Sequence, residues 1–362
     1  MEFIDLKAQQ ARIKPEIDRR IATVLEHGRY IMGPEVGELE QHLAEYVGVD
    51  YCISAASGTD SLLIALMALG VGYGDEVITV PYTWISTAEV ISLLGAKPVF
   101  IDIENDSWNM DPNLLEAAIT DRTKAIMPVG IYGQTADMTA INEIADRHGL
   151  PVIEDGAQSF GATHHGKKSC ALSLVGSTSF FPSKPLGGYG DGGALFTNDE
   201  ELAKKMGQIR LHGQEKKHHH PILGLNGRLD TLQAAIILPK LGIFDDEIKK
   251  RQRVAKRYID TLSNSSQEVT VPCVTEGNTS VWAQFTILSP DRDAFAARLG
   301  ERNIPTVSYY SVPLHLQPVF AGLGYKLGDF PVSELVAKQG LSLPMNPYLS
   351  ETEIDQVCDS LT

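Results

Sequence analysis

The pattern that most restricts the fold is a regular alternation of short apolar segments with longer amphipathic ones between residues 51 and 211. Such alternation is typical of strand–helix–strand units, whose strands run parallel and need helices over both faces of the sheet. We therefore expect an α/β fold with a mostly parallel sheet. After a first strand that begins at residue 51, strands are predicted at 76–79, 97–101, 123–128, 151–155 and 194–197, and helices at 61–69, 87–94, 113–119, 138–148 and 199–211.

The length of 362 residues favours a large domain with a smaller one attached. We expect a first domain over 1–244 and an α+β domain over 245–362, joined by a long charged helix at 245–263 and marked off by the polar stretch 263–267. Helices are also predicted at 13–26, 36–46 and 232–241 in the first domain, and at 291–300, 332–339 and 351–361 in the second, whose strands are predicted at 281–288, 306–310 and 341–343.

Lys184 ends an apolar run and is followed by four glycines between residues 187 and 192. A lysine in apolar surroundings loses hydration, so its pKa falls and its neutral amine can form a Schiff base with a carbonyl. The glycines allow the backbone to approach a flat ligand closely. The alternative is a strand followed by a surface turn, with Lys184 in solvent.

Polar or flat side chains also occur at other predicted strand ends, where open α/β sheets bind their ligands. Asp155 ends one strand and Gln158 follows it, while Trp84 follows another. A carboxylate here can hold a protonated ring nitrogen, and the indole can stack on a flat ring. Helix capping by Asp155 and a core or interface role for Trp84 are the alternatives.

Residues 57–60, Ser-Gly-Thr-Asp, join a strand to a helix. The free N–H groups at such a helix start favour a bound phosphate. Ordinary capping by Ser57 or Thr59 explains the same residues. A phosphate cup, a stacking aromatic, a carboxylate and a Schiff-base lysine are together the parts of a pyridoxal phosphate site.

Composition excludes several other classes of protein. The formal charge of 31 − 46 = −15 disfavours non-specific binding to nucleic acid or an anionic membrane. Four scattered cysteines and the absence of a secretory signal or apolar span lead us to expect a cytoplasmic protein with reduced thiols. The three histidines in the cationic loop 216–220 lack a nearby carboxylate or cysteine in the sequence pattern, so we expect no metal site and interpret them as solvated or substrate-facing.

Taken in order, these motifs resemble those of the DegT/StrS family of sugar-nucleotide aminotransferases. The resemblance runs from Phe3 to Met345 and rests on residues 57–60, 154–158, 179–184, 190–193, 226–230 and 313–317. It implies a pyridoxal phosphate enzyme of fold type I, like aspartate aminotransferase, with a seven-stranded sheet in the large domain.

The resemblance also implies roles for individual residues. Lys184 matches the Schiff-base lysine, Asp155 the acid that pairs with the ring nitrogen, and Gln158 the amide near the cofactor's phenolic oxygen. Gly58, Thr59 and Ser179 match the phosphate cup, and Trp84 matches the stacked aromatic. Asn226 matches an asparagine that reaches the cofactor phosphate of a neighbouring subunit, which implies a homodimer with shared active sites.

Within the family, the chain looks most similar to aminotransferases that act at C3 of a UDP-linked 2-acetamido-3-oxo-hexuronic acid, with glutamate as donor, for bacterial surface polysaccharide (O-antigen). Candidate substrate-binding residues are Arg228, His212, Tyr309, Tyr310 and His315, together with loop 216–220. Tyr309-Tyr310-Ser311 replaces the His-Tyr-Pro of such relatives, and Gly130 replaces their His or Ser. Another UDP- or dTDP-linked keto sugar, a sugar dehydratase or decarboxylase, and a non-catalytic regulator are the alternatives; Lys184 argues against the dehydratase branch, in which histidine replaces the lysine.

Overall fold

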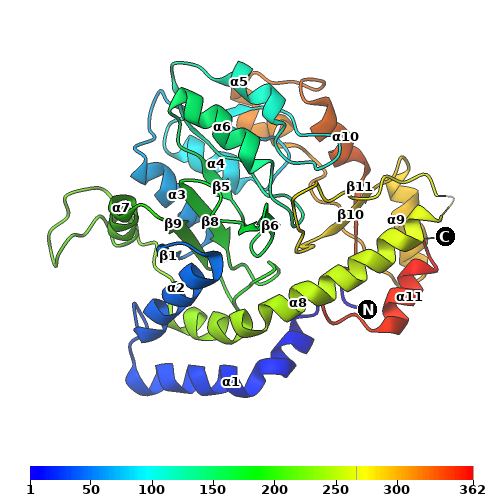
Figure 1. The fold of residues 1–362 in the computed structure, drawn as a ribbon, viewed down its shortest axis with the longest axis horizontal. Helices are drawn as coiled ribbons and strands as arrows, with labels where there is room; N and C mark the ends of the chain where they lie inside the picture. Colours follow the sequence, from blue (N-terminus) through cyan, green and yellow to red (C-terminus); the bar gives the residue numbers. More distant parts are fainter. Residues whose placement is uncertain (266, 362) are drawn as a thin grey trace.

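The computed structural model describes residues 1–265 and 267–361 (Figure 1). Ser266, which falls in the predicted boundary stretch 263–267, and Thr362 lie outside the described residues. The strands that matter for the site are β1 (Tyr51–Ala55), β2 (Glu76–Thr79), β3 (Lys97–Phe100), β4 (Thr123–Ile126), β5 (Ile153–Asp155), β8 (Val175–Ser179) and β9 (Gly193–Thr197).

These strands form one mixed sheet at the centre of the molecule. A three-stranded part has the order β3-β2-β4, and a four-stranded part has the order β1-β9-β8-β5. Parallel bridges between Ile126 and Val152 and between Val129 and Asp155 join β4 to β5. All pairs are parallel except those of β9, which runs antiparallel to β8 and β1. The predicted mostly parallel, seven-stranded sheet is therefore confirmed.

Both faces of the sheet are buried because successive strand residues point to opposite sides. In β2, Val77 packs into one hydrophobic cluster and Ile78 into another. The first cluster includes side chains of α3 (Gly58–Ala68), α4 (Ser86–Leu93) and α7 (Glu200–Arg210). The second includes side chains of α6 (Met138–His148) and α10 (Pro331–Gln339), and a further cluster includes α2 (Pro34–Val47). Helices therefore cover both faces, which leaves strand ends and their loops for a site.

The two helices predicted at 232–241 and 245–263 form a single helix, α8 (Thr231–Ser263), with Pro239 inside it. The prediction of a break was wrong because Phe244 is buried and continues the apolar face across the supposed gap. Helix α1 (Leu6–His27) lies alongside α8 (Figure 1). The proposed domain division after residue 244 falls within α8, whose later residues pack into a C-terminal cluster with β10 (Phe285–Leu288) and α11 (Glu351–Cys358).

Three further predictions were wrong in detail. The region 306–310 is not a strand and makes only a single bridge, Val307 with Ser342 of β11 (Gly340–Leu343). The helix predicted at 113–119 is a short 3-10 turn, Pro112–Leu114, followed by α5 (Leu115–Ala118). The strand predicted at 281–288 covers only β10, which pairs antiparallel with β11. The predicted helix at 291–300 is present as α9 (Arg292–Glu301). None of the helices among the described residues is both long and apolar enough to cross a membrane.

Glu154 is a buried acid of β5 whose pKa is raised to about 7, chiefly by burial. Ser169 Oγ and the Cys170 N–H donate to its carboxylate at 2.6 and 2.8 Å. Because the folded-state pKa exceeds the ordinary value of 4.5, folding binds a proton between these two pH values. This group's contribution to stability is present below about pH 4.5 and is lost as the pH rises towards 7.

We therefore expect Glu154→Gln to gain stability relative to the unsubstituted protein as the pH rises from 4.5 to 7. The difference in unfolding free energy between the two proteins should grow by about 3 kcal/mol over that range. Urea unfolding of both proteins at several pH values measures it. A difference that does not change with pH would contradict the raised pKa.

Candidate active site

Asp155 and Lys184 lie at the same edge of the sheet because they follow neighbouring parallel strands. Asp155 ends β5 and pairs in register with Ser177 of β8, and Lys184 comes five residues after the end of β8. Burial lowers the pKa of the Lys184 amine, and the charge of Asp155 opposes that effect. Burial in turn raises the pKa of Asp155. The structure thus brings the predicted lysine and acid into one environment.

The Asp155 carboxylate has two fixed donors besides the Lys184 charge. Thr87 Oγ1, from α4, donates to Oδ2 at 2.9 Å, and the Ala157 N–H donates to Oδ1 at 3.2 Å. Both bonds, like the charge of Lys184, lower the pKa of Asp155 and favour its ionised form. No helix begins at Asp155 in the described part of the chain, so the capping alternative does not apply. Thr87 was not among the predicted site residues, although the helix that contains it, α4, begins two residues after Trp84.

We expect Thr87→Val to lower kcat/KM about tenfold, because it removes one hydrogen bond to a buried charge while keeping the side-chain shape. The pKa of Asp155 should rise, since the bond stabilises its ionised form. Steady-state kinetics across pH measures both effects. Thr87→Ser keeps the hydroxyl and serves as the control; an equal loss in the two variants would contradict this role of the hydroxyl.

Gln158 joins the strand edge to the C-terminal part of the chain. Its Oε1 accepts the Tyr132 N–H at 3.0 Å, and its Nε2 donates to the Tyr310 hydroxyl at 3.0 Å. The Tyr310 ring lies 6.1 Å from the Trp84 ring, centre to centre. Trp84 is 58% exposed, so its indole is accessible for stacking in this single chain. Trp84, Tyr310 and Gln158 therefore form one connected group beside Asp155, in which the indole is exposed and Gln158 is buried.

The main chain at Tyr309 is held by hydrogen bonds from two buried tyrosines, Tyr82 and Tyr132. The hydroxyls of Tyr82 and Tyr132 both donate to the Tyr309 carbonyl oxygen, and the Tyr310 N–H donates to the Tyr82 hydroxyl at 3.1 Å. Tyr82 follows β2 and Tyr132 follows β4, so both come from strand ends. This arrangement brings residues 309 and 310 to the same sheet edge as Asp155.

The predicted phosphate cup is compact. A side chain on Gly58 would place its Cβ 2.6 Å from the Cβ of Ser179, so only glycine allows this approach of α3 to the end of β8. Ser57 accepts the Asp60 N–H at 3.0 Å and caps α3, as the capping alternative proposed. Thr59 Oγ1 lies 2.8 Å from Ser86 Oγ and does not cap the helix. Gly58, Thr59 and Ser179 therefore meet at one helix start.

Asn226 and Arg228 belong to a second group of residues. They line a cavity of about 390 Å³ together with Gly190 and Asp191, on the loop that follows Lys184. Asn226 is exposed, and the Nε of Arg228 is buried without a partner among the described residues. The His212 N–H donates to Leu225 O at 3.0 Å, and its carbonyl lies 2.9 Å from His220 Nδ1. No hydrogen bond found among the described residues links this group to Asp155.

Two other residues considered for the substrate site, His315 and Gly130, are buried. His315 is 0% exposed in side-chain area, its Nε2 lies 3.0 Å from Glu334, and its ring contacts Phe330. Gly130 is buried, and a Cβ there would lie 2.2 Å from Ser159 Oγ, so the larger side chains of relatives do not fit this packing. Substrate binding by His315 therefore stays a prediction that the packing of this chain does not support.

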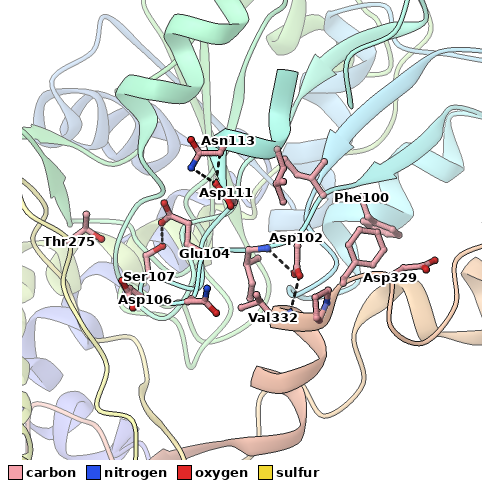
Figure 2. Close-up of a pocket in the computed structure, with 16 residues that line it drawn as sticks. Phe100, Asp102, Glu104, Asp106, Ser107, Asp111, Asn113, Thr275, Asp329 and Val332 are labelled. Atoms are coloured by element: carbon pink, nitrogen blue, oxygen red, sulfur yellow. Dashed lines mark hydrogen bonds between the residues drawn. The ribbon is translucent and has the colours of Figure 1, made fainter. Parts of the chain in front are cut away.

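A cavity of about 710 Å³ lies elsewhere, and none of the predicted site residues lines it (Figure 2). Its acidic side chains have structural partners: Asp102 accepts the N–H groups that begin α10, Asp111 caps a 3-10 turn, and Glu104 accepts from the Ser107 hydroxyl.

Residues 1–265 and 267–361 contain no cluster of three or more His, Cys, Asp or Glu placed to hold a metal ion. In loop 216–220 the three histidines are exposed, and His219 lies 3.1 Å from Glu215.

Comparison with known proteins gives matches over the whole chain. The sequence profile of the DegT/DnrJ/EryC1/StrS aminotransferase family matches residues 11–362. A UDP-2-acetamido-2-deoxy-3-oxo-D-glucuronate aminotransferase from Pseudomonas aeruginosa is 56% identical over 100% of this chain and 99% of its own. The crystal structure of a DegT/DnrJ/EryC1/StrS aminotransferase from Brucella abortus superposes with a TM-score of 0.96 at 46% identity, covering 100% of this chain and 98% of that one. A Bacillus subtilis protein crystallised with the bound cofactor PMP gives a TM-score of 0.90 at 33% identity, covering 99% and 82%.

Proposed function

The chain belongs to the DegT/DnrJ/EryC1/StrS aminotransferase family, and from that premise we propose that it transfers an amino group from glutamate to C3 of a UDP-linked 2-acetamido-3-oxo-hexuronic acid. The substrate proposal is supported by the 56% identity to the glucuronate aminotransferase of Pseudomonas aeruginosa. The mechanism is supported above all by one observation: the buried Asp155 and the half-buried Lys184 share one edge of the sheet and affect each other's ionisation.

The enzyme is a pyridoxal phosphate-dependent transaminase, and the residues present fit that cofactor. Gly58 allows helix α3 to approach Ser179 closely, which suits a phosphate at the helix start. The supported carboxylate of Asp155 suits a protonated ring nitrogen, and the exposed indole of Trp84 suits a stacked ring. When bound, pyridoxal phosphate supplies the electron sink and carries the amino group.

Lys184 supplies the proton transfers in this proposal. Because burial lowers its pKa, a larger fraction of its amine is neutral near pH 7 than in water, and a neutral amine can take the proton from the amine-bearing carbon of the donor. Thr87 and Ala157 both donate to Asp155 and, with the charge of Lys184, favour its ionised form against the effect of burial. Gln158, held between Tyr132 and Tyr310, keeps its amide in a fixed orientation beside them.

The proposal includes a homodimer with shared active sites. Asn226 is exposed and lies with Arg228 outside the Lys184 group, as expected for residues that complete a neighbouring subunit's site. Large apolar side chains are also exposed near these loops, among them Ile31 in the Asn226 cavity and Phe181 beside Lys184. Burying such side chains between two copies of the chain is favourable. We place the enzyme in the cytoplasm, in the synthesis of bacterial surface polysaccharide (O-antigen).

Recognition of a uronic acid requires cationic groups despite the acidic surface. Arg228 has a buried Nε without a partner in the described structure, so a carboxylate that paired with it would satisfy that donor. His212 and the exposed loop 216–220 add further cationic or donor groups near the same cavity. Tyr309 and Tyr310, which lie at the strand edge with Asp155, are further candidate sugar-binding residues.

The direct test incubates the holoenzyme with glutamate and a panel of UDP- and dTDP-linked keto sugars, and identifies products by mass and NMR. We expect glutamate to bleach the visible absorbance of the bound cofactor, and the UDP-linked 3-oxo-hexuronic acid to yield a 3-amino product. Amination of a dTDP-linked 4-keto sugar instead would favour the alternative substrate within the family. Visible absorbance without bleaching would favour a dehydratase, and no absorbance at all would favour a regulator.

A further inference from the structure

Lys240 of α8 is a buried lysine that the proposed mechanism does not use. Its side chain is 1% exposed, and its Nζ donates to the carbonyl oxygen of Gly187 at 2.6 Å. The same Nζ lies 4.4 Å from the centre of the Tyr189 ring. Gly187 and Tyr189 follow Lys184 by three and five residues. The ammonium therefore contacts, at two points, the loop that carries the proposed catalytic lysine.

A second residue of α8 contacts the same loop. Gln233 precedes Lys240 by seven residues and so lies on the same face of the helix. Its Oε1 accepts the Tyr189 N–H at 2.9 Å. A Cβ on Gly188 or on Gly190 would lie 2.8 Å from the Gln233 amide. Lys240 and Gln233 therefore bind the loop to α8 through hydrogen bonds. Gly188 and Gly190 allow this close approach because they have no side chains.

The charge of Lys240 has a partner further along the helix. Glu247 is 2% exposed and follows Lys240 by seven residues, and its charge raises the pKa of Lys240, although burial dominates and brings that pKa to about 8. Glu247 is itself held by Gln9 of α1, whose Nε2 donates at 2.9 and 3.1 Å, and by the Tyr348 hydroxyl. A buried charge costs free energy that an apolar side chain would avoid. What a lysine adds here is a strong, fixed donor to the Gly187 carbonyl.

We infer that Lys240 is a positioning residue for Lys184, holding loop 185–190 against α8 so that the Lys184 amine stays beside Asp155. On its other side the loop is closed by the Gly188 N–H, which donates to Phe180 O at 2.7 Å. Lys240 supplies the opposing anchor. The inference rests on the proposed function in so far as Lys184 is the proton-transfer group.

The test compares Lys240→Met with a matched control. Methionine keeps the length and apolar stem of the side chain but removes its charge and its donors. The control is Lys205→Met, which also removes a hydrogen bond from a lysine Nζ to a backbone carbonyl oxygen at 2.6 Å. The acceptor in this case is Ala68, which ends α3, whereas Gly58 begins it. Amide hydrogen exchange is measured over the peptide 184–193 in all three proteins, without added cofactor. We expect exchange there to rise at least about tenfold in Lys240→Met only.

Kinetics of the loaded enzymes add a second readout. We expect kcat of Lys240→Met to fall about 10- to 100-fold, with KM for glutamate within about twofold, because a displaced base slows the reaction more than it weakens binding. Lys205→Met should match the unsubstituted enzyme. If Lys240→Met does not fold, Gln233→Leu removes the other anchor and is expected to show the same exchange and kcat effects.

Unchanged exchange over 184–193 together with unchanged kcat in folded Lys240→Met would overturn the inference. An equal rise in exchange in Lys205→Met would also overturn it, because the effect would then be general destabilisation. Failure of the unsubstituted protein to transaminate would refute the proposed function instead. The exchange comparison would still decide whether Lys240 holds the loop.

Discussion

Replacement of Lys184 by alanine is expected to abolish amino-group transfer, with a loss in kcat of at least about 10⁴-fold. The reason is that Lys184 is the amine whose charge acts on Asp155, and burial lowers the pKa of this amine while the charge of Asp155 opposes that shift. The half-reaction with glutamate, followed by the visible absorbance of the bound cofactor, measures the loss. The fold should survive, since the half-buried side chain contributes little to the packed clusters.

Lys184→Arg is the matched control for charge. Arginine keeps a positive group near Asp155 but stays protonated at every accessible pH, so it cannot act as a base. We expect this variant to be as inactive as Lys184→Ala. Small external amines are expected to restore part of the activity of Lys184→Ala and none of Lys184→Arg, because only alanine leaves room for them. Substantial transamination in either variant without added amine would refute the role of Lys184.

Replacement of Asp155 by asparagine is expected to lower kcat about 10²- to 10³-fold, since a neutral amide cannot keep the ring nitrogen of the cofactor protonated. The substitution preserves shape and the acceptor for Thr87, so folding should be largely retained. Measurement of kcat for both half-reactions, with circular dichroism and thermal unfolding as controls for folding, tests this.

Asp155→Asn should also shift the titration of the neighbouring amine. The Asp155 charge raises the pKa of Lys184, so its removal leaves burial unopposed and lowers that pKa further. The lower limb of the pH–rate profile should move to lower pH in this variant. Unchanged kcat would remove Asp155 from the mechanism, and an unmoved limb would separate Asp155 from Lys184.

The sequence predicts the sheet well because its signals are local. Each central strand is a short apolar run between helical patterns, and residues such as Val77 and Ile78 need only alternate to build both faces. Asp155 and Lys184 could be paired in advance because carboxyl ends of parallel strands meet at one edge. Residues 57–60 indicated a phosphate cup at a helix start, whereas Ser179 entered that prediction only through the family resemblance.

What the sequence does not reveal depends on partners distant along the chain. In the sequence, nothing distinguishes Thr87 from an ordinary helix residue. Only the fold brings its Oγ1 within 2.9 Å of Asp155 Oδ2, at the end of β5. From the sequence, Lys240 is expected to be a surface lysine. Only the packing of α8 on loop 185–190 buries it. His315 belongs to a recognisable motif, yet it is buried against Glu334. The strand predicted at 306–310 fails because two phenols, rather than a full ladder of strand hydrogen bonds, fix that segment.

The hydroxyls of Tyr82 and Tyr132 donate hydrogen bonds to the main-chain oxygen of Tyr309. Because every amino acid has this oxygen, the anchoring of position 309 does not depend on the side chain there. A histidine at position 309 would therefore be held in the same way as the tyrosine, while the side chain offered to the proposed sugar site would differ. Under the proposed function, a change of sugar can begin with a change of side chain at this position, without rearrangement of the main chain that carries it.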